Sequence, residues 1–129
     1  MSVYGKITPT HFPSEVGLLF EELTGPRGDM WGLRAAITIV RFRKRHDRSP
    51  TFLELFDDLL DAPRLSALER KIDWSSMSRD TARGFRHHCA IHWHRSGWIA
   101  WERTPRSLRP GPAFAVASRR WRSDRQPAA

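Results

Sequence analysis

The residues best suited to chemistry in this chain are the arginines and histidines between Ser78 and Ser96. Guanidinium groups pair with phosphates and with guanine edges, and imidazoles can also contact phosphates. Small and apolar side chains alternate with these polar ones at helical spacing. The apolar stripe comprises Ala82, Phe85, Cys89, Trp93 and Ser96, and the polar side comprises Asp80, Arg83, Gly84, His87 and His94, with Arg79 and Arg86 at its margins. This pattern predicts a helix with one buried face and one face that meets a polyanion.

Both ends of this helix carry suitable residues. Ser78 can serve as the N-cap, because its hydroxyl can accept a hydrogen bond from a backbone N–H of the first turn. Gly97 can end the helix, because glycine readily adopts the left-handed conformation that is common after the last turn. We therefore expect the helix to span residues 78–96.

A β-hairpin is expected after the helix. Residues 98–103 are rich in bulky side chains and predict a strand, and Ala113 to Val116 can return as its partner. The prolines and glycine of residues 104–112 favour a turn between the two strands. Arg106 and Arg109 would then lie near the tip of the hairpin.

Positive charge is concentrated in the second half of the chain. Residues 1–62 contain 8 Lys and Arg against 9 Asp and Glu, whereas residues 63–129 contain 14 against 5. The net charge of +8 therefore arises in the half that contains the expected helix and hairpin. Such an asymmetric field attracts a polyanion, and nucleic acid is the commonest soluble one.

Length and composition limit the class of protein. A chain of 129 residues with 40% hydrophobic content can form one globular domain. The single Cys89 excludes an internal disulfide, and no stretch approaches the length of a membrane span. Residues 1–13 lack the charged and then apolar pattern of a signal peptide. We therefore expect a cytoplasmic protein without a membrane partner.

The chain divides into three expected parts. Residues 1–28 would form an N-terminal arm and a short helix from Ser14 to Leu23, which Gly25 and Pro26 would end. Residues 29–117 would form the main domain. Residues 118–129 would be a basic, partly disordered tail.

Residues 29–45 predict a long helix with two apolar stripes. One stripe comprises Met30, Leu33, Ile37 and Val40, and the other comprises Trp31, Ala35, Ile39 and Phe42. A helix that is apolar on two sides must be covered on two sides. One side would pack on the core, and the other on the helix from Ser14 or on a second copy in a homodimer. The basic residues 41–46 could contact phosphates or simply favour the end of the helix.

Residues 51–61 predict another helix. Thr51 and Glu54 have the spacing of a capping box, and the phenylalanines and leucines that follow form an apolar stripe. The outer face is acidic and comprises Glu54, Asp57, Asp58 and Asp61. These carboxylates could form an acid/base pair or hold a metal, but a solvated face is the favoured interpretation, because no histidine or glycine-rich loop accompanies them.

The order of these elements resembles the winged helix-turn-helix superfamily, in the style of MarR-like or GntR-like bacterial regulators. Residues 30–45 resemble its first helix, residues 51–61 its second, residues 78–96 its recognition helix and residues 98–116 its wing. The resemblance implies a mainly α fold with a small β-hairpin wing, here with an additional N-terminal helix. It covers roughly residues 30–116 and rests on element order and on the Ser-Gly-Trp-Ile exit at residues 96–99.

The resemblance also implies a function. Proteins of this superfamily regulate transcription by binding double-stranded DNA, often as dimers, so we expect a sequence-specific DNA-binding protein that is associated with the nucleoid when bound. The recognition helix would read the major groove, and the wing would reach an adjacent groove or phosphates. The residues expected to contact DNA are Ser78, Arg79, Thr81, Arg83, Arg86, His87, Arg106 and Arg109.

The connection between the second and third helices departs from the family pattern. The family joins them by a short turn, whereas residues 62–77 are sixteen residues long. Pro63 followed by periodic apolar residues predicts an extra helix inside this connection, and residues 73–77 predict a turn. The helix-turn-helix could then contain either residues 51–61 or the inserted helix, and residues 78–96 remain the reader in both cases.

A metal site is an alternative for part of the same helix. His88 and His92 have the i, i+4 spacing that can bring two imidazoles to one metal, and Cys89 is adjacent. A closed site would need further ligands, and only His11, His46 or Glu102 are obvious donors. Cys89 also lies on the apolar stripe, where a small thiol packs well. We therefore expect no bound metal and no other cofactor.

Enzymatic activity has no support in the sequence. There is no GxSxG motif, phosphate-binding loop, dinucleotide fingerprint or paired cysteine motif. Two other functions stay open. One is a protein-interaction module that binds polymerase, a sigma factor or a replication protein through Trp98, Trp101 and the basic tail. The other is a plasmid or phage factor that binds a replication origin.

Overall fold

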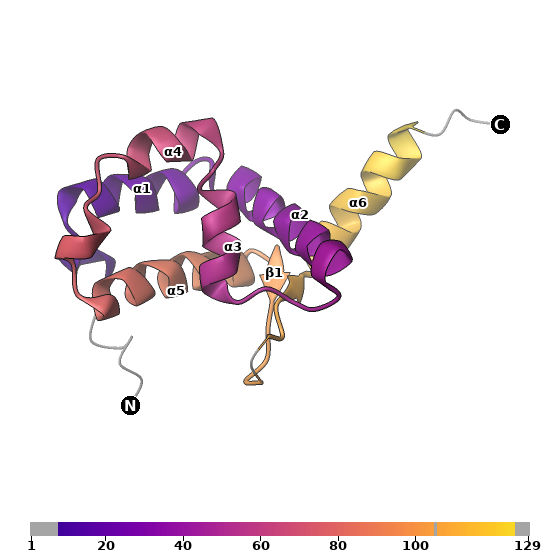
Figure 1. Cartoon of the computed structure of the whole chain (residues 1–129). Helices are drawn as coiled ribbons and strands as arrows, with labels where there is room; N and C mark the ends of the chain where they lie inside the picture. Colours follow the sequence, from indigo (N-terminus) through magenta and orange to yellow (C-terminus); the bar gives the residue numbers. More distant parts are fainter. Residues whose placement is uncertain (1–7, 105, 126–129) are drawn as a thin grey trace.

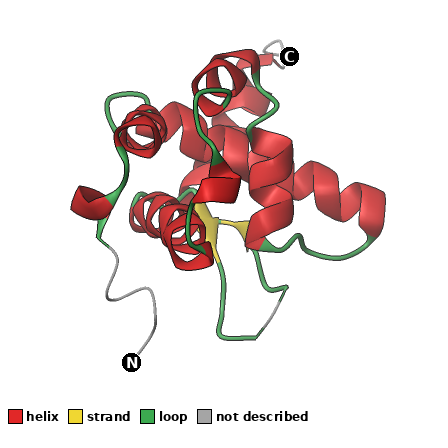
Figure 2. Cartoon of the chain, turned by 60° about the vertical axis from the view of Figure 1, so that its left-hand side comes forward, coloured by secondary structure: helices red, strands yellow, loops and turns green. Residues whose placement is uncertain are grey.

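The computed structural model describes residues 8–104 and 106–125. Over these residues the protein is mainly helical, with one small antiparallel sheet, as the sequence predicts (Figure 1). The elements in chain order are η2 (Pro9–His11), α1 (Ser14–Thr24), α2 (Gly28–His46), α3 (Phe52–Leu59), α4 (Pro63–Glu69), η3 (Trp74–Ser76), α5 (Arg79–Arg95), β1 (Ile99–Ala100), β2 (Arg109–Pro110) and α6 (Pro112–Arg125). Figure 2 shows helices forming nearly all of the body, with the loop of the hairpin extending away from it.

The core is organised around Trp93 of α5, whose side chain is fully buried. Its indole stacks on Phe56 of α3 with ring centroids 5.6 Å apart. The indole Nε1 donates a hydrogen bond to the backbone carbonyl of Leu23, 3.0 Å away, in the last turn of α1. Carbonyls in the last turn of a helix have no partner within that helix, so the indole satisfies one of them. Trp93 thus joins three elements that are distant in the sequence.

α2 packs against the same tryptophan through a glycine. A Cβ atom at Gly32 would lie 2.5 Å from Cδ1 of Trp98 and 3.1 Å from Cδ1 of Trp93. The indole of Trp98 also donates a hydrogen bond to the carboxylate of Asp29, 3.0 Å away. Only a residue without a side chain lets two indoles approach α2 this closely.

The start of α3 is fixed by the capping box that the sequence predicts. The backbone N–H of Glu54 donates to the Thr51 hydroxyl at 3.1 Å, and the backbone N–H of Thr51 donates to the Glu54 carboxylate at 3.0 Å. Arg48 adds two hydrogen bonds to the same carboxylate, at 2.9 and 2.7 Å. The Arg48 guanidinium is the main cause that lowers the pKa of Glu54 to about 2.

The prediction of a long inserted connection is confirmed. It contains α4 followed by the short helix η3. α4 packs mainly on α1, whereas α3 packs on both α2 and α5, and Figure 1 shows α4 and α1 side by side. Residues 52–59, rather than the inserted helix, therefore lie beside the expected reader.

The predicted return strand at residues 113–116 is wrong. β1 pairs with β2, so that Ile99 lies opposite Pro110 and Ala100 opposite Arg109. Residues 113–116 instead belong to α6, because Pro112 is a suitable first helical residue and the alanines that follow favour a helix. The hairpin is therefore shorter than expected.

The expected boundary after residue 117 falls inside α6. Residues 118–125 continue this helix, which points away from the body of the protein in Figure 1. They are not the loose extension that the sequence suggests, and residues 126–129 lie outside the described part. At the other end, residues 9–11 form a short 3-10 helix, and residues 1–7 of the expected arm are likewise outside the described part.

Replacing Trp93 by Phe should destabilise the protein. The substitution leaves the carbonyl of Leu23 without its partner and removes part of the stacked indole, so the free energy of unfolding should fall by about 1–3 kcal/mol or more. Urea denaturation followed by circular dichroism measures this change. Trp121→Phe is the control, because Trp121 is 59% exposed and the same replacement there should cost less than about 0.5 kcal/mol. Equal effects at the two positions would contradict the role given to Trp93.

Candidate nucleic-acid interface

α5 has the ends that the sequence predicts and part of the predicted buried face, because Ala82 is half-buried and Ser96 is exposed. The Ser78 hydroxyl accepts a hydrogen bond from the backbone N–H of Thr81 at 3.2 Å, so Ser78 is the N-cap. Gly97 follows the helix with φ of +83°, a left-handed conformation that favours glycine. Phe85, Cys89 and Trp93 are buried, which leaves the opposite side of the helix to solvent.

An open groove of about 980 Å³ runs along the exposed side of α5. Its walls come from three places in the sequence: the first half of α5, the start of α3, and the loop between β1 and β2. The residues that line it are Pro50, Thr51, Phe52, Leu53, Arg79, Ala82, Arg83, Arg86, His87, Trp101, Glu102, Arg103, Thr104, Arg106, Ser107 and Leu108.

The groove combines an apolar floor with a strongly basic lining. Two elements supply its five arginines: α5 contributes Arg79, Arg83 and Arg86, and the hairpin loop contributes Arg103 and Arg106. Glu102 is the one carboxylate among the described residues that line it. Guanidinium groups arriving from two sides of a concave surface attract an extended anion, such as a phosphate backbone.

The aromatic floor is held by contacts between α3, α5 and the hairpin. Phe52 and Trp101 meet edge to face with ring centroids 5.3 Å apart. Trp101 also lies against the ring of His94 at 4.8 Å, and the Nδ1 atom of His94 is 3.2 Å from the backbone carbonyl of Ile99. These contacts fix the hairpin relative to the start of α3.

Five of the eight residues predicted to contact DNA line this groove. They are Arg79, Arg83, Arg86, His87 and Arg106. Ser78 and Thr81 lie outside it and instead form the cap of α5, with their hydroxyl oxygens 2.8 Å apart. Arg109 is exposed but forms an ion pair with Glu102, 3.4 Å away, in the loop between β1 and β2.

One residue of the predicted polar face is placed differently. Gly84 is buried, although helical spacing puts it beside the exposed Arg83. A glycine has no side chain to direct outward, so its backbone can lie against the core without burying a polar group. The polar face of α5 is therefore narrower than the sequence pattern suggests.

The sequence patterns do not assign three of the groove residues to a DNA-binding surface. Arg103 falls at the end of a predicted strand, Phe52 on the apolar stripe of a predicted helix, and Trp101 among the residues of a possible protein contact. Each comes from a segment outside α5, and only the packing of α3 against α5 and the hairpin brings them together. The position of Arg103, between a tryptophan-rich strand and a proline-containing turn, is the one local signal that could have indicated it.

The histidine-rich part of α5 has the surroundings of a packed helix. Among residues 8–104 and 106–125, no group of three or more His, Cys, Asp or Glu side chains could hold a metal ion. Cys89 is fully buried, and this burial raises the pKa of its thiol. His88 lies against Phe12 at a centroid distance of 6.2 Å.

The apolar stripe of α2 that contains Met30 stays partly accessible. Trp31, Ala35 and Ile39 of the other stripe are buried, whereas Met30 is 42% exposed and Ile37 is half-buried. The homodimer through this helix stays a prediction.

Within the described part of the chain, no helix combines the length and the apolar character that crossing a membrane requires.

The acidic face of α3 lies away from the groove lining. Asp57, Asp58 and Asp61 are exposed, and none of them lines the groove. Burial is the main cause that raises the pKa of Glu69 on α4, with Asp57 and Asp61 adding to the shift. The acidic face of α3 therefore lies near α4 and outside the groove, whereas Asp80 of α5 and Glu102 lie close to the arginines.

Comparisons of the chain with models of known families, with curated proteins and with solved structures found no match. The likeness to the winged helix-turn-helix superfamily therefore stays a prediction from element order.

His87 should make the stability of the protein depend on pH. Burial is the main cause that lowers the pKa of His87, and the charge of His88 adds to it. Because the unfolded chain binds a proton on His87 more readily, this contribution to stability is complete above about pH 6.5 and is lost as pH falls through the lowered folded-state value. Relative to His87→Gln, the native protein should therefore have a lower free energy of unfolding at about pH 5 than at about pH 7.5. Titration of the His87 ring by NMR with a midpoint at or above about 6.5 would contradict this.

Proposed function

We propose that the protein binds double-stranded DNA sequence-specifically and acts as a transcriptional regulator. The observation that carries the proposal is the groove, in which arginines from α5 and from the hairpin loop converge on one concave surface. In this proposal α5 enters the major groove, and the predicted wing, residues 104–112, which ends in the structure at the start of α6, contacts an adjacent groove or the phosphates.

The exposure of the arginines supports different roles for them. Arg79 and Arg83 are exposed on the first half of α5, so their side chains can extend toward base edges. Arg86 is half-buried nearer the core, which favours a shorter contact to a phosphate. Arg106 is exposed on the loop at the other wall of the groove, where it would hold the same backbone.

The apolar floor favours a second candidate function. Phe52, Trp101 and Leu108 line a concave surface, and Leu53 beside them is 52% exposed. An acidic peptide segment with apolar side chains, from a polymerase, a sigma factor or a replication protein, would fit such a surface. A factor that binds a plasmid or phage origin would share the DNA-binding biochemistry of the first proposal.

Salt dependence and sequence preference separate these functions. An interaction module would bind duplexes only through its excess of positive charge, so its affinity would be weak, equal for all sequences and steeply lowered by salt. A reader of base edges keeps a preference among sequences near physiological salt.

Selection of bound duplexes from a random DNA library near physiological salt should enrich a defined motif. Arg83→Ala should weaken binding to that motif by about 1–3 kcal/mol and relax one base preference, because alanine cannot form the bidentate pair with a base. Arg95→Ala is the matched control, since Arg95 is an exposed arginine of the same helix that does not line the groove. A variant whose affinity falls equally for all duplexes would show that Arg83 contacts phosphate, and no enrichment with the native protein would favour the interaction module.

A further inference from the structure

A second basic surface lies at the end of α2. It comprises Arg41, Arg43, Lys44 and Arg45, here named the α2-end cluster, and all four side chains are exposed. Among the described residues, none of the four takes part in an ion pair or a side-chain hydrogen bond. Four cations within five residues are thus held at one helix end without a carboxylate partner.

Stabilisation of the helix end does not account for so much charge. A cation in the last turn interacts favourably with the helix dipole. Arg41 and Arg45, however, are four residues apart on the same side of the helix, and like charges at this spacing repel by a comparable amount. Asp47 is an exposed carboxylate beside the cluster, but a single carboxylate offsets only one of the four positive charges.

In the turn after the cluster, the charge of Arg48 is already neutralised by Glu54. The Arg48 guanidinium is held by two hydrogen bonds to Glu54 and lies 4.9 Å from the centroid of the Phe42 ring. The ring of Phe42 in turn lies 4.2 Å from that of His46. Glu54 is therefore engaged by Arg48, and it does not offset the charge of the cluster.

The α2-end cluster adjoins the arginine groove. A depression of about 450 Å³ beside it is lined by Val40, Arg43, Lys44, Asp47, Arg48, Ser49 and Pro110. The groove is lined by the very next residue of the turn, Pro50, and by Leu108 of the hairpin. Only the turn before α3 and the strand β2 therefore separate the two concave surfaces.

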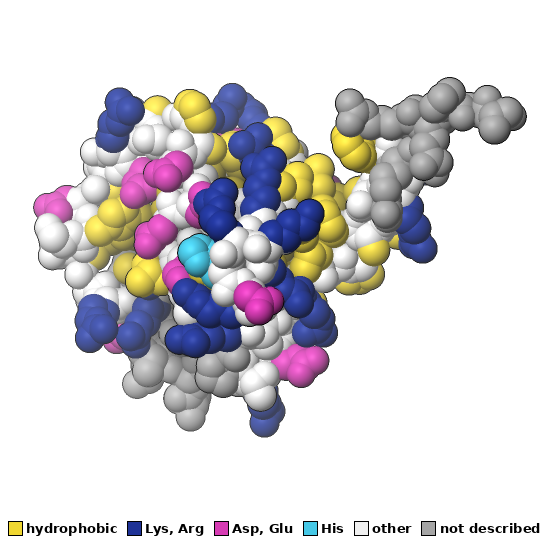
Figure 3. All heavy atoms as spheres, turned by 45° about the vertical axis from the view of Figure 1, so that its right-hand side comes forward, with side chains coloured by type: hydrophobic (Ala, Val, Ile, Leu, Met, Phe, Trp, Pro, Cys, Tyr) yellow, Lys and Arg dark blue, Asp and Glu magenta, His cyan; other side chains and the backbone are white. Residues whose placement is uncertain are grey.

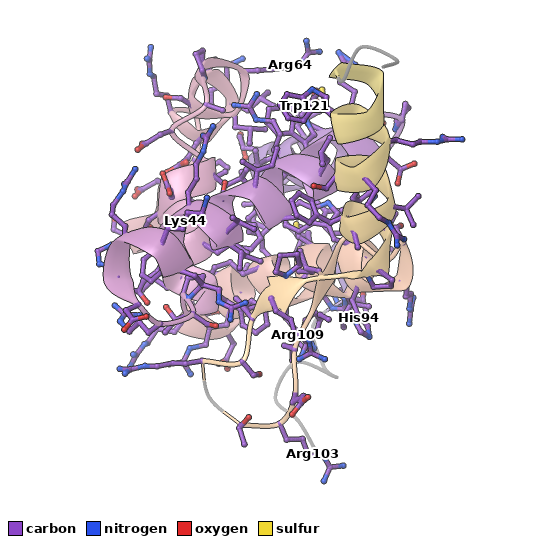
Figure 4. All side chains as sticks on the ribbon, turned by 90° about the vertical axis from the view of Figure 1, so that its right-hand side faces the viewer. Lys44, Arg64, His94, Arg103, Arg109 and Trp121 are labelled. Atoms are coloured by element: carbon purple, nitrogen blue, oxygen red, sulfur yellow. The ribbon has the colours of Figure 1, made fainter. Side chains whose placement is uncertain are left out.

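The figures agree with this continuity. Figure 3 shows Lys and Arg side chains gathered in a band down the middle of one face of the protein. In Figure 4, Arg109 of β2 lies between Lys44 on one side and Arg103 near the tip of the hairpin. Arg109 therefore lies between the cluster and the basic loop in this view, and its guanidinium pairs with Glu102.

We propose that the α2-end cluster is a second contact for the phosphate backbone of the same duplex that occupies the groove. This inference rests on the proposed function. A duplex carries one negative charge per about 1.7 Å of its axis, so a DNA molecule held in the groove presents further phosphates to surfaces beside it. The cluster reads no bases. It adds affinity and fixes the orientation of the protein on the duplex.

The test is the salt dependence of duplex binding by the full chain, with Arg43→Gln and Lys44→Gln combined. The logarithm of the binding constant falls linearly with the logarithm of the salt concentration, and each phosphate contact adds about 0.9 to the steepness of this fall. The line for the double variant should therefore be shallower than that for the native protein by up to about 1.8. The enriched motif should stay the same, because the residues that face bases are untouched. Glutamine retains most of the side-chain stem and favours a helix, and circular dichroism checks that the variant folds.

A charge-matched control is available at the opposite end of the protein. Arg70→Gln with Lys71→Gln removes the same charge from two exposed residues after α4, far from the hairpin in Figure 1. Its salt slope should equal that of the native protein. Equal slopes for both double variants would overturn the inference and leave the proposed function standing. Failure of the native protein to bind any duplex, even at low salt, would overturn both.

Discussion

Burial of the Trp93 indole is the constraint on which the rest of the structure depends. The side chain stacks on α3, satisfies a carbonyl at the end of α1, and lies under a glycine of α2. These contacts fix both the position of α5 and its rotation about its own axis. Because one face of the helix is committed to them, the arginine-bearing face must point outward, beside the start of α3.

The groove follows from that placement. Once α3 and α5 are fixed, the short hairpin after α5 contacts the start of α3 through Trp101 and Phe52. The hairpin loop then forms the third wall of the groove, beside α5 and the start of α3. The positions of the charged side chains agree with this arrangement. Arginines line the groove and the surface at the end of α2, whereas Asp57 and Asp58 of α3 and Asp61 just after it lie outside the groove. A polyanion would therefore approach the face that carries α5 and the hairpin.

The features that can be predicted from the sequence are those with local causes. The caps of α5 and the capping box of α3 depend on residues three or four positions apart, and the structure confirms both. The predicted return strand is wrong, because alanine-rich residues after Pro112 suit a helix, and the path of the chain is decided by contacts between distant residues. A Cβ atom at Gly111 would collide with the backbone of Gly97, so two segments distant in the sequence set where the hairpin ends and α6 begins.

The candidate site is predictable only in part for the same reason. Helical periodicity identifies Arg79, Arg83 and Arg86 as residues of one polar surface, because they share a helix. Arg103 and Phe52 belong to the same groove, but no spacing in the sequence relates them to α5. Gly84 shows the reverse case, in which periodicity assigns a residue to a polar face although it has no side chain to place there.

The most direct test of the central claim is a map of backbone amide shifts by NMR when duplex DNA is added to the native protein. Binding in the groove predicts shifts concentrated in residues 79–87 and 101–108, with little change in α1 and α4. Shifts that are absent at low salt, or that fall on α1 and α4 while the groove stays unchanged, would contradict the claim that α5 and the hairpin form a DNA-binding surface.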